Sequence, residues 1–131
     1  MTYLVDSDWL ISYLNGRADA EAVLGGLYSE GLAISVVTYG EVLEGFIEAA
    51  GSMPQSSQFE SFVGTMDLLP VDMEVGRRYA AIRYELRRQG QLIADNDLWI
   101  AATGLAHDLT LVTRDRHFER VPGLKLYQQV R

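Results

Sequence analysis

The sequence predicts an α/β protein, a three-layer α/β/α sandwich around a central, mainly parallel sheet. Short, continuously apolar segments recur along the chain, and helical segments separate them. Parallel strands that are buried on both faces have this apolar character, and helical crossovers connect them. The chain has 131 residues, of which 48% are hydrophobic, so we expect one domain over residues 1–131 with a substantial core.

The first half of the chain is expected to alternate between strands and helices. A strand over 2–5 ends at Asp6, and a helix over 7–14 follows it. Apolar residues at helical spacing predict a second helix through 20–27, which stops at Gly31. The next expected elements are a strand over 32–36, a helix from Thr38 to Gly51, a helix that starts at Pro54, and a short strand over 68–71.

The clearest helical pattern in the sequence spans about 72–89. Apolar residues recur on one face of this segment, and Gly90 ends it. The following helix, over about 95–107, is apolar on most faces, so we expect it to be buried. Strands over 109–113 and 124–127 complete the predicted sheet.

Four acidic residues are expected to meet at one edge of this sheet. Asp6 ends the first strand, and Asp115 lies just past the strand over 109–113. Glu41 and Asp97 fall in the first turns of their predicted helices. In right-handed βαβ units the carboxyl ends of the strands and the helix N-termini share one edge, where open α/β proteins bind ligands.

This group of carboxylates predicts a site for a divalent cation. Four carboxylates in one pocket repel one another unless a cation intervenes or some stay protonated. Oxygen ligands without His or Cys favour Mg²⁺ or Mn²⁺ over zinc. An acidic site of this kind suits phosphoryl chemistry, in which a metal activates water and stabilises the leaving oxygen.

Each acid also has a purely structural interpretation. Thr38 and Glu41 have the spacing of a capping box. Asp95 or Asn96 is the expected N-cap of its helix, and Asp97 would then gain from the helix dipole. In the same way, Asp6 could cap the first helix, and Asp115 could be an ordinary turn residue. Taken together, four acids at one edge favour a shared site.

The charge of the chain is unusual for a protein that binds nucleic acid. The formal net charge is −7, although bound metal would neutralise part of an acidic cluster. Ten of the eleven basic residues are arginine, which suits phosphate binding. Arg114 and Arg116 flank Asp115 and are candidates for contacts to substrate phosphate, or else balance surface charge. Without cysteines or a long apolar run, we expect a cytoplasmic protein with no membrane segment.

Four segments together resemble the PIN-domain family, and most closely its VapC and FitB toxins. Each segment carries one of the four acids, and the order and spacing agree with the family over almost the full chain. The segments are 4–11 (LVDSDWLI), 35–45 (SVVTYGEVLEG), 93–102 (IADNDLWIAA) and 111–118 (LVTRDRHF).

The resemblance implies a small metal-dependent ribonuclease. The four acids would coordinate Mg²⁺ or Mn²⁺, and RNA, with tRNA as one candidate, would be hydrolysed by metal-activated water to leave 5′-phosphate ends. Thr113 would orient the site by hydrogen bonding, and Asp95 and Asp8 would lie in its outer shell. Family members usually dimerise, and a VapB-like antitoxin blocks the site.

Two other functions compete with this interpretation. Asp6, Ser7 and Asp8 mimic the two-aspartate motif of haloacid-dehalogenase-like phosphatases, but such enzymes need a lysine at the site. The single lysine of the chain, Lys125, falls in the last strand. The second alternative is a non-catalytic PIN-like binding module, and the presence of all four acids argues against it.

Overall fold

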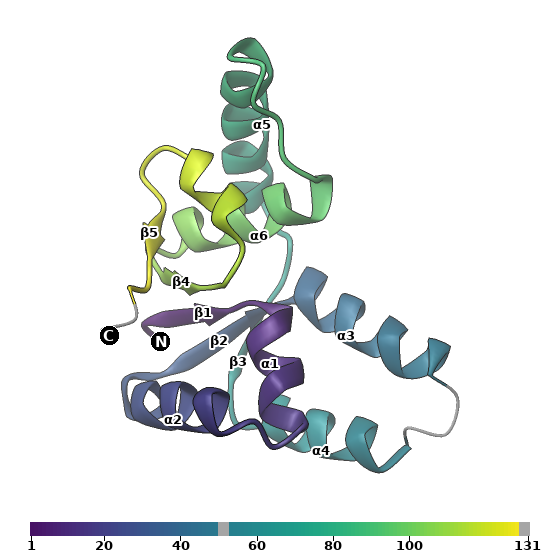
Figure 1. The fold of residues 1–131 in the computed structure, drawn as a ribbon. Helices are drawn as coiled ribbons and strands as arrows, with labels where there is room; N and C mark the ends of the chain where they lie inside the picture. The colour runs from purple at the N-terminus through teal and green to yellow at the C-terminus, as the bar shows by residue number, and fades with distance from the viewer. Residues whose placement is uncertain (50–52, 129–131) are drawn as a thin grey trace.

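The computed structural model describes residues 1–49 and 53–128, apart from the side chains of residues 53–55, and it has the predicted α/β/α architecture (Figure 1). The described strands form one sheet in which every pairing is parallel. Its order is β3-β2-β1-β4-β5. The strands are β1 (Tyr3–Val5), β2 (Leu32–Ser35), β3 (Asp67–Leu69), β4 (Thr110–Val112) and β5 (Lys125–Leu126).

The helices follow the predicted order, and each predicted helix is present. They are α1 (Ser7–Leu14), α2 (Ala18–Leu27), α3 (Val36–Glu48), α4 (Met53–Val63), α5 (Met73–Arg88) and α6 (Asp95–Ala106). Two 3₁₀ helices, η1 (Tyr28–Glu30) and η2 (Arg116–Arg120), were not expected. The predicted end of the third helix at Gly51 lies outside the described residues. None of the described helices is long and apolar enough to cross a membrane.

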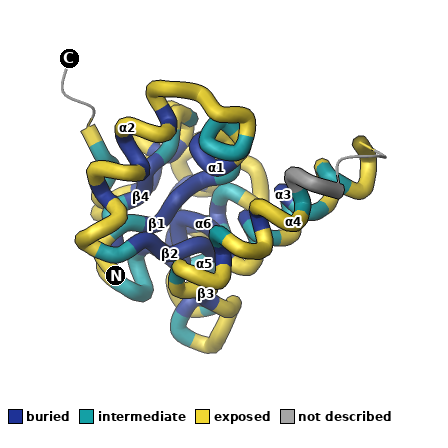
Figure 2. Tube along the Cα trace, turned by 90° about the horizontal axis from the view of Figure 1, so that it is seen from below, coloured by how far each residue is buried: buried dark blue, intermediate teal, exposed yellow. Residues whose placement is uncertain are grey.

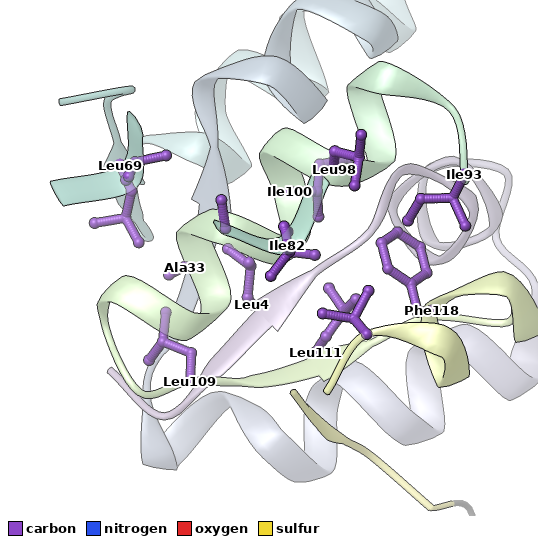
Figure 3. Close-up of a cluster of buried hydrophobic side chains, with 14 of the residues drawn as sticks. Leu4, Ala33, Leu69, Ile82, Ile93, Leu98, Ile100, Leu109, Leu111 and Phe118 are labelled. Atoms are coloured by element: carbon purple, nitrogen blue, oxygen red, sulfur yellow. The ribbon is translucent and has the colours of Figure 1, made fainter. Parts of the chain in front are cut away.

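Both faces of the sheet are buried. Neighbouring residues of a strand point to opposite faces, and they belong to two different hydrophobic clusters. Leu4 and Leu111 belong to a hydrophobic cluster with α5, α6 and Phe118 (Figure 3). Val5 and Val112, one residue further along, join a second cluster with α1, α2 and α4. Figure 2 shows the result as buried strands between helices whose outer surfaces are exposed. The two clusters produce the three layers.

The sheet has a topological switch point between β1 and β4. Residues after β1 continue through β2 to β3 on one side, whereas β4 and β5 lie on the other side. Strand β1 pairs with β4 in parallel, with Val5 opposite Val112. The chain therefore leaves β1 and β4 at the same edge and in opposite directions, which is where open α/β proteins bind ligands.

The start of α3 differs from the prediction. Strand β2 ends at Ser35, whose side-chain oxygen accepts a hydrogen bond from the Val37 amide at 3.1 Å and caps the helix. The predicted capping box of Thr38 and Glu41 was therefore wrong. Helix α3 begins two residues earlier than expected, because the Ser35 side chain caps the helix directly after β2. Glu41 consequently lies in the second turn of α3 rather than the first.

The start of α6 also needs a correction. Ala94 occupies the N-cap position without a side-chain hydrogen bond, so neither Asp95 nor Asn96 is the cap. Both side chains are inside the first turn, as is that of Asp97. This frees the three polar side chains of that turn to contact other elements.

Candidate active site

The switch point places two of the predicted acids side by side. Asp6 follows β1 directly and is the N-cap of α1, while Asp115 follows β4 and is the N-cap of η2. The amide of Asp6 donates to the carbonyl of Val112 at 3.0 Å, so the sheet ladder continues up to the acid itself. Asp6 is only 6% exposed. The fold therefore fixes one carboxylate firmly at this edge of the sheet.

Neutral donors hold the Asp6 carboxylate in place. Its Oδ1 accepts from the amide of Ser7 at 2.8 Å, and its Oδ2 accepts from the Thr113 hydroxyl at 2.7 Å. Burial raises the pKa of Asp6, and these two hydrogen bonds only partly oppose that rise. Neighbouring Asp8 and Asp115 raise it further. A buried carboxylate whose partners are uncharged favours a nearby cation.

Thr113 also supports the second acid. Its hydroxyl oxygen accepts from the amide of Asp115 at 3.0 Å while it donates to Asp6. One side chain thus joins the loops that follow β1 and β4. The orienting role predicted for Thr113 remains a prediction, and these contacts supply a physical basis for it.

Replacing Thr113 with valine is expected to lower the free energy of unfolding at pH 7 by about 1–3 kcal/mol, because the buried Asp6 carboxylate loses a donor while volume is nearly kept. Chemical denaturation measures the change. Thr65→Val is the matched control, since its hydroxyl donates to the Phe62 carbonyl at an exposed position and should matter by less than about 0.5 kcal/mol. Equal losses in both variants would contradict a special role for Thr113.

Glu41 reaches the same region from α3. Its Oε2 accepts from the side-chain amide of Asn96 at 3.2 Å, which connects α3 to α6. Burial raises the pKa of Glu41, and Asp6, Asp8 and Glu44 raise it further by repulsion. Helix α3 packs against α1, so Glu41 lies within electrostatic reach of Asp6 and Asp8.

Asp97 shows most clearly that the four acids share one environment. Burial raises its pKa to about 6, and repulsion from Asp6, Asp115 and Glu41 adds to that rise. His117 opposes it. Residues that are far apart in sequence thus act on one carboxyl group. The predicted convergence of the acids at this edge agrees with the structure's electrostatics.

The carboxylates are neighbours without forming a closed cage. Within residues 1–49 and 53–128, no three His, Asp or Glu side chains are arranged so that they could hold a metal ion as they stand. Their oxygens are instead turned to local partners: Thr113 for Asp6, Asn96 for Glu41, and the amide of His117 for Asp115 at 2.9 Å. The donor chemistry still fits a hard divalent cation, since the acids supply only oxygen ligands, and burial together with mutual repulsion raises the pKa of Asp6, Glu41 and Asp97.

The other predicted site residues lie in different places. Asp8 is exposed in the first turn of α1 and adds to the repulsion at Asp6 and Glu41. Asp95 turns towards α5, where its Oδ1 accepts from the Tyr79 hydroxyl at 3.3 Å and lies 3.6 Å from Arg83 Nε. Asp8 therefore belongs to the acidic region, whereas Asp95 joins α6 to α5.

The two arginines that flank Asp115 differ from each other. Arg114 contacts α1 and α2, and its side chain is 36% exposed. Arg116 is 87% exposed, and its Nε lies 3.9 Å from Glu119. Only Arg116 has the exposure expected of a contact to a large polyanion.

Sequence reasoning missed two residues that contact the acids. Asn96 was considered only as a helix cap, although its position directly before Asp97 lets it reach α3 from the same helical turn. His117 was given no role, yet its Nδ1 lies 3.3 Å from Asp115 Oδ1. The spacing of two residues between Asp115 and His117 is the available signal, because an aspartate at an N-cap accepts from the amide two positions later.

Comparison with known proteins gives consistent matches over almost the whole chain. Residues 3–124 match the PIN domain family. Ribonuclease VapC5 of Mycobacterium tuberculosis is 29% identical over 130 residues, covering 98% of this chain and 93% of the relative. Ribonuclease VapC1 of Methanocaldococcus jannaschii is 33% identical over 129 residues, covering 96% and 87%. The crystal structure of VapBC2 from Rickettsia felis, bound to a DNA fragment from its promoter, matches with a TM-score of 0.89 at 26% identity, covering 97% of this chain and 98% of that one.

Proposed function

Because the chain belongs to the PIN domain family, we propose that it is the ribonuclease toxin of a VapBC-type toxin–antitoxin pair. The observation that carries this proposal is the convergence of the four acids: Thr113 bonds to both Asp6 and Asp115, and Asn96, next to Asp97, bonds to Glu41. Burial and repulsion from the other three acids accordingly raise the pKa of Asp97 to about 6. Four acids close together at one edge of the sheet are a poor arrangement for a purely structural role, because their repulsion destabilises the fold.

The site would act with a divalent cation, Mg²⁺ or Mn²⁺. Asp6, Glu41, Asp97 and Asp115 are the residues that would hold it. A cation bound there supplies positive charge that lowers the pKa of water and offsets the charge of the phosphodiester. Within the chain, Thr113 and the Ser7 amide orient Asp6, and Asn96 orients Glu41. Above about pH 6 Asp97 has released its proton, so its carboxylate is available as a ligand.

The proposed reaction is hydrolysis of an RNA phosphodiester. Water adds to phosphorus, the bond from phosphorus to the 3′ oxygen breaks, and the products carry a 5′-phosphate and a 3′-hydroxyl. Arg116 is the proposed contact to RNA phosphate, and its exposure beside Asp115 supports this role.

A VapB-like antitoxin is the proposed protein partner. The support is the likeness to VapBC2 of Rickettsia felis and to a toxin–antitoxin complex from Klebsiella pneumoniae, which matches with a TM-score of 0.76 at 27% identity. The family resemblance also suggests a homodimer. Growth arrest on expression, relieved when the cognate antitoxin is co-expressed, is the expected behaviour of such a toxin.

The phosphatase alternative loses support in the structure. Lys125 lies on β5 and donates to the carbonyl of Asp108 at 3.2 Å, with its Nζ also 3.0 Å from Asp108 Oδ1. Asp108 precedes β4, at the edge of the sheet opposite Asp115. The lysine that a haloacid-dehalogenase-like site needs is therefore at the wrong end of the strands.

The proposed function is tested by incubating the purified chain with structured RNA and MgCl₂. We expect fragments with 5′-phosphate ends, and chelation by EDTA should stop their formation. A small monoester such as p-nitrophenyl phosphate should stay intact. Hydrolysis of the monoester with intact RNA would support the phosphatase instead. Firm antitoxin binding without any metal-dependent cleavage would indicate a binding module.

A further inference from the structure

One arginine side chain fastens the loop that carries Asp115 to two helices. Arg114 Nη1 donates to Ser12 Oγ of α1 at 3.0 Å, and its Nη2 donates to Asp19 Oδ2 of α2 at 2.8 Å. Its guanidinium carbon lies 3.8 Å from the centroid of the Trp9 ring, and Trp9 is 4% exposed. The guanidinium therefore has a hydrogen-bond partner on each helix and an aromatic face beneath it.

These contacts are specific to Arg114. Asp19 has a second basic neighbour, Arg17, but that ion pair is 4.0 Å long and Arg17 is 68% exposed. Arg116, two positions after Arg114, reaches only Glu119 at 3.9 Å. The close anchor between the loop and α2 is thus the bond from Arg114 to Asp19.

The anchored loop is the one that joins two acids of the site. Thr113 and Asp115 are connected to each other and, through the Thr113 hydroxyl, to Asp6. The Arg114 side chain points instead towards α1 and α2, where its partners Ser12 and Asp19 lie. Asp6 is the N-cap of α1, and Trp9 and Ser12 lie on that same helix. The loop therefore contacts α1 twice: Thr113 bonds to the N-cap residue Asp6, and Arg114 contacts Trp9 and Ser12 further along the helix.

We propose that Arg114 is a positioning residue: by binding Asp19, Ser12 and Trp9 it holds Asp115 in register with Asp6, and it does not contact RNA phosphate. The effect on cleavage rests on the ribonuclease function proposed above. The anchoring of the loop does not, so the two can be tested separately.

The anchor is tested first on the protein without metal or RNA, by amide hydrogen exchange. The informative amides are those of Asp115 and His117, whose acceptors are Thr113 Oγ1 and Asp115 Oδ1. Asp19→Asn is the sharper variant, because it removes the charge but keeps a side-chain oxygen. That oxygen can still accept the hydrogen bond that the Ala20 amide donates to Asp19 Oδ1 at 2.9 Å. Exchange at both amides should rise about tenfold in Asp19→Asn and in Arg114→Gln.

Two control variants keep this test specific. Arg17→Gln removes the distant neighbour of Asp19, and Arg116→Gln removes the other arginine beside Asp115. Neither should change exchange at the two amides. Should Arg114→Gln fail to fold, Asp19→Asn tests the same bond from its other partner. Exchange at the parent rate in Asp19→Asn would overturn the proposed anchor.

Steady-state kinetics then separate positioning from RNA contact. Positioning predicts that Asp19→Asn and Arg114→Gln lower kcat by about tenfold with KM for RNA nearly unchanged, and that the double variant is no worse than either single one. Arg114→Lys should fail to restore kcat, because lysine lacks the planar fork. A raised KM in Arg114→Gln with parent kinetics in Asp19→Asn would show a phosphate contact and overturn the proposal. A parent protein that cleaves no RNA would refute the ribonuclease function, and the exchange result would still decide the anchor.

Discussion

Replacing Asp97 with asparagine is expected to reduce RNA cleavage by more than about a hundredfold, since even outer-shell partners of metal ligands affect activity by 10- to 100-fold. The other three acids all raise the pKa of Asp97 by repulsion, so Asp97 is close to each of them, and its loss removes a carboxylate that all three would share a cation with. The measurement is the initial rate of RNA cleavage at saturating Mg²⁺. Asp95→Asn is the matched control, because Asp95 lies in the same helical turn but contacts Tyr79 and Arg83 on α5.

The folded state of Asp97→Asn provides the second part of this test. The pKa of Asp97 is raised in the folded protein, so its contribution to stability is complete below the unfolded value of 3.8 and is lost as pH rises through about 6. Without metal, the variant should therefore be at least as stable as the parent at pH 7, by up to about 1 kcal/mol after solvent screening. A variant that unfolds, or that cleaves RNA at the parent rate, would contradict the assigned role.

Divalent cations are expected to stabilise the folded parent strongly at neutral pH. A cation that binds only the folded state at 100 times its Kd adds about 2.7 kcal/mol to the free energy of unfolding. The gain should shrink below about pH 6, where protonated Asp97 no longer contributes charge. Thermal unfolding with MnCl₂ and with EDTA at pH 5 and pH 7.5 measures it.

The same experiment on Asp97→Asn distinguishes site binding from general screening of the net charge of −7. Screening would raise the Tm of parent and variant alike, and NaCl of equal ionic strength would reproduce it. Site binding predicts that the variant loses most of the gain. Equal gains in both proteins would contradict a cation site at Asp97.

The order of elements and the layers of the fold could be predicted from the sequence, because apolar runs and helical periodicity report burial directly. Element ends were less predictable. Thr38 was the expected cap of α3, whereas β2 pairs with β3 up to Ser35 and Ser35 itself caps the helix. The short helix η2 follows from Asp115 as a cap, a local signal that the apolar pattern does not contain.

The position of the four acids could be predicted from topology alone, since strand ends and helix starts are fixed by chain order. Their hydrogen-bond partners could not. Asn96 reaches Glu41 across 55 positions, and Arg114 reaches Asp19 across 95, so both contacts depend on how helices pack. Arg114 illustrates the difference: its place beside Asp115 suggested a phosphate contact, whereas packing gives it protein partners.

Anomalous diffraction from crystals grown with MnCl₂ tests most directly whether these acids hold a divalent ion. We predict a peak at the switch point, with oxygens of Asp6 and Asp97 and of Glu41 or Asp115 at about 2.1–2.2 Å, near the distance that small divalent ions require. Peaks confined to exposed carboxylates such as Asp95, with none between β1 and β4, would contradict the account.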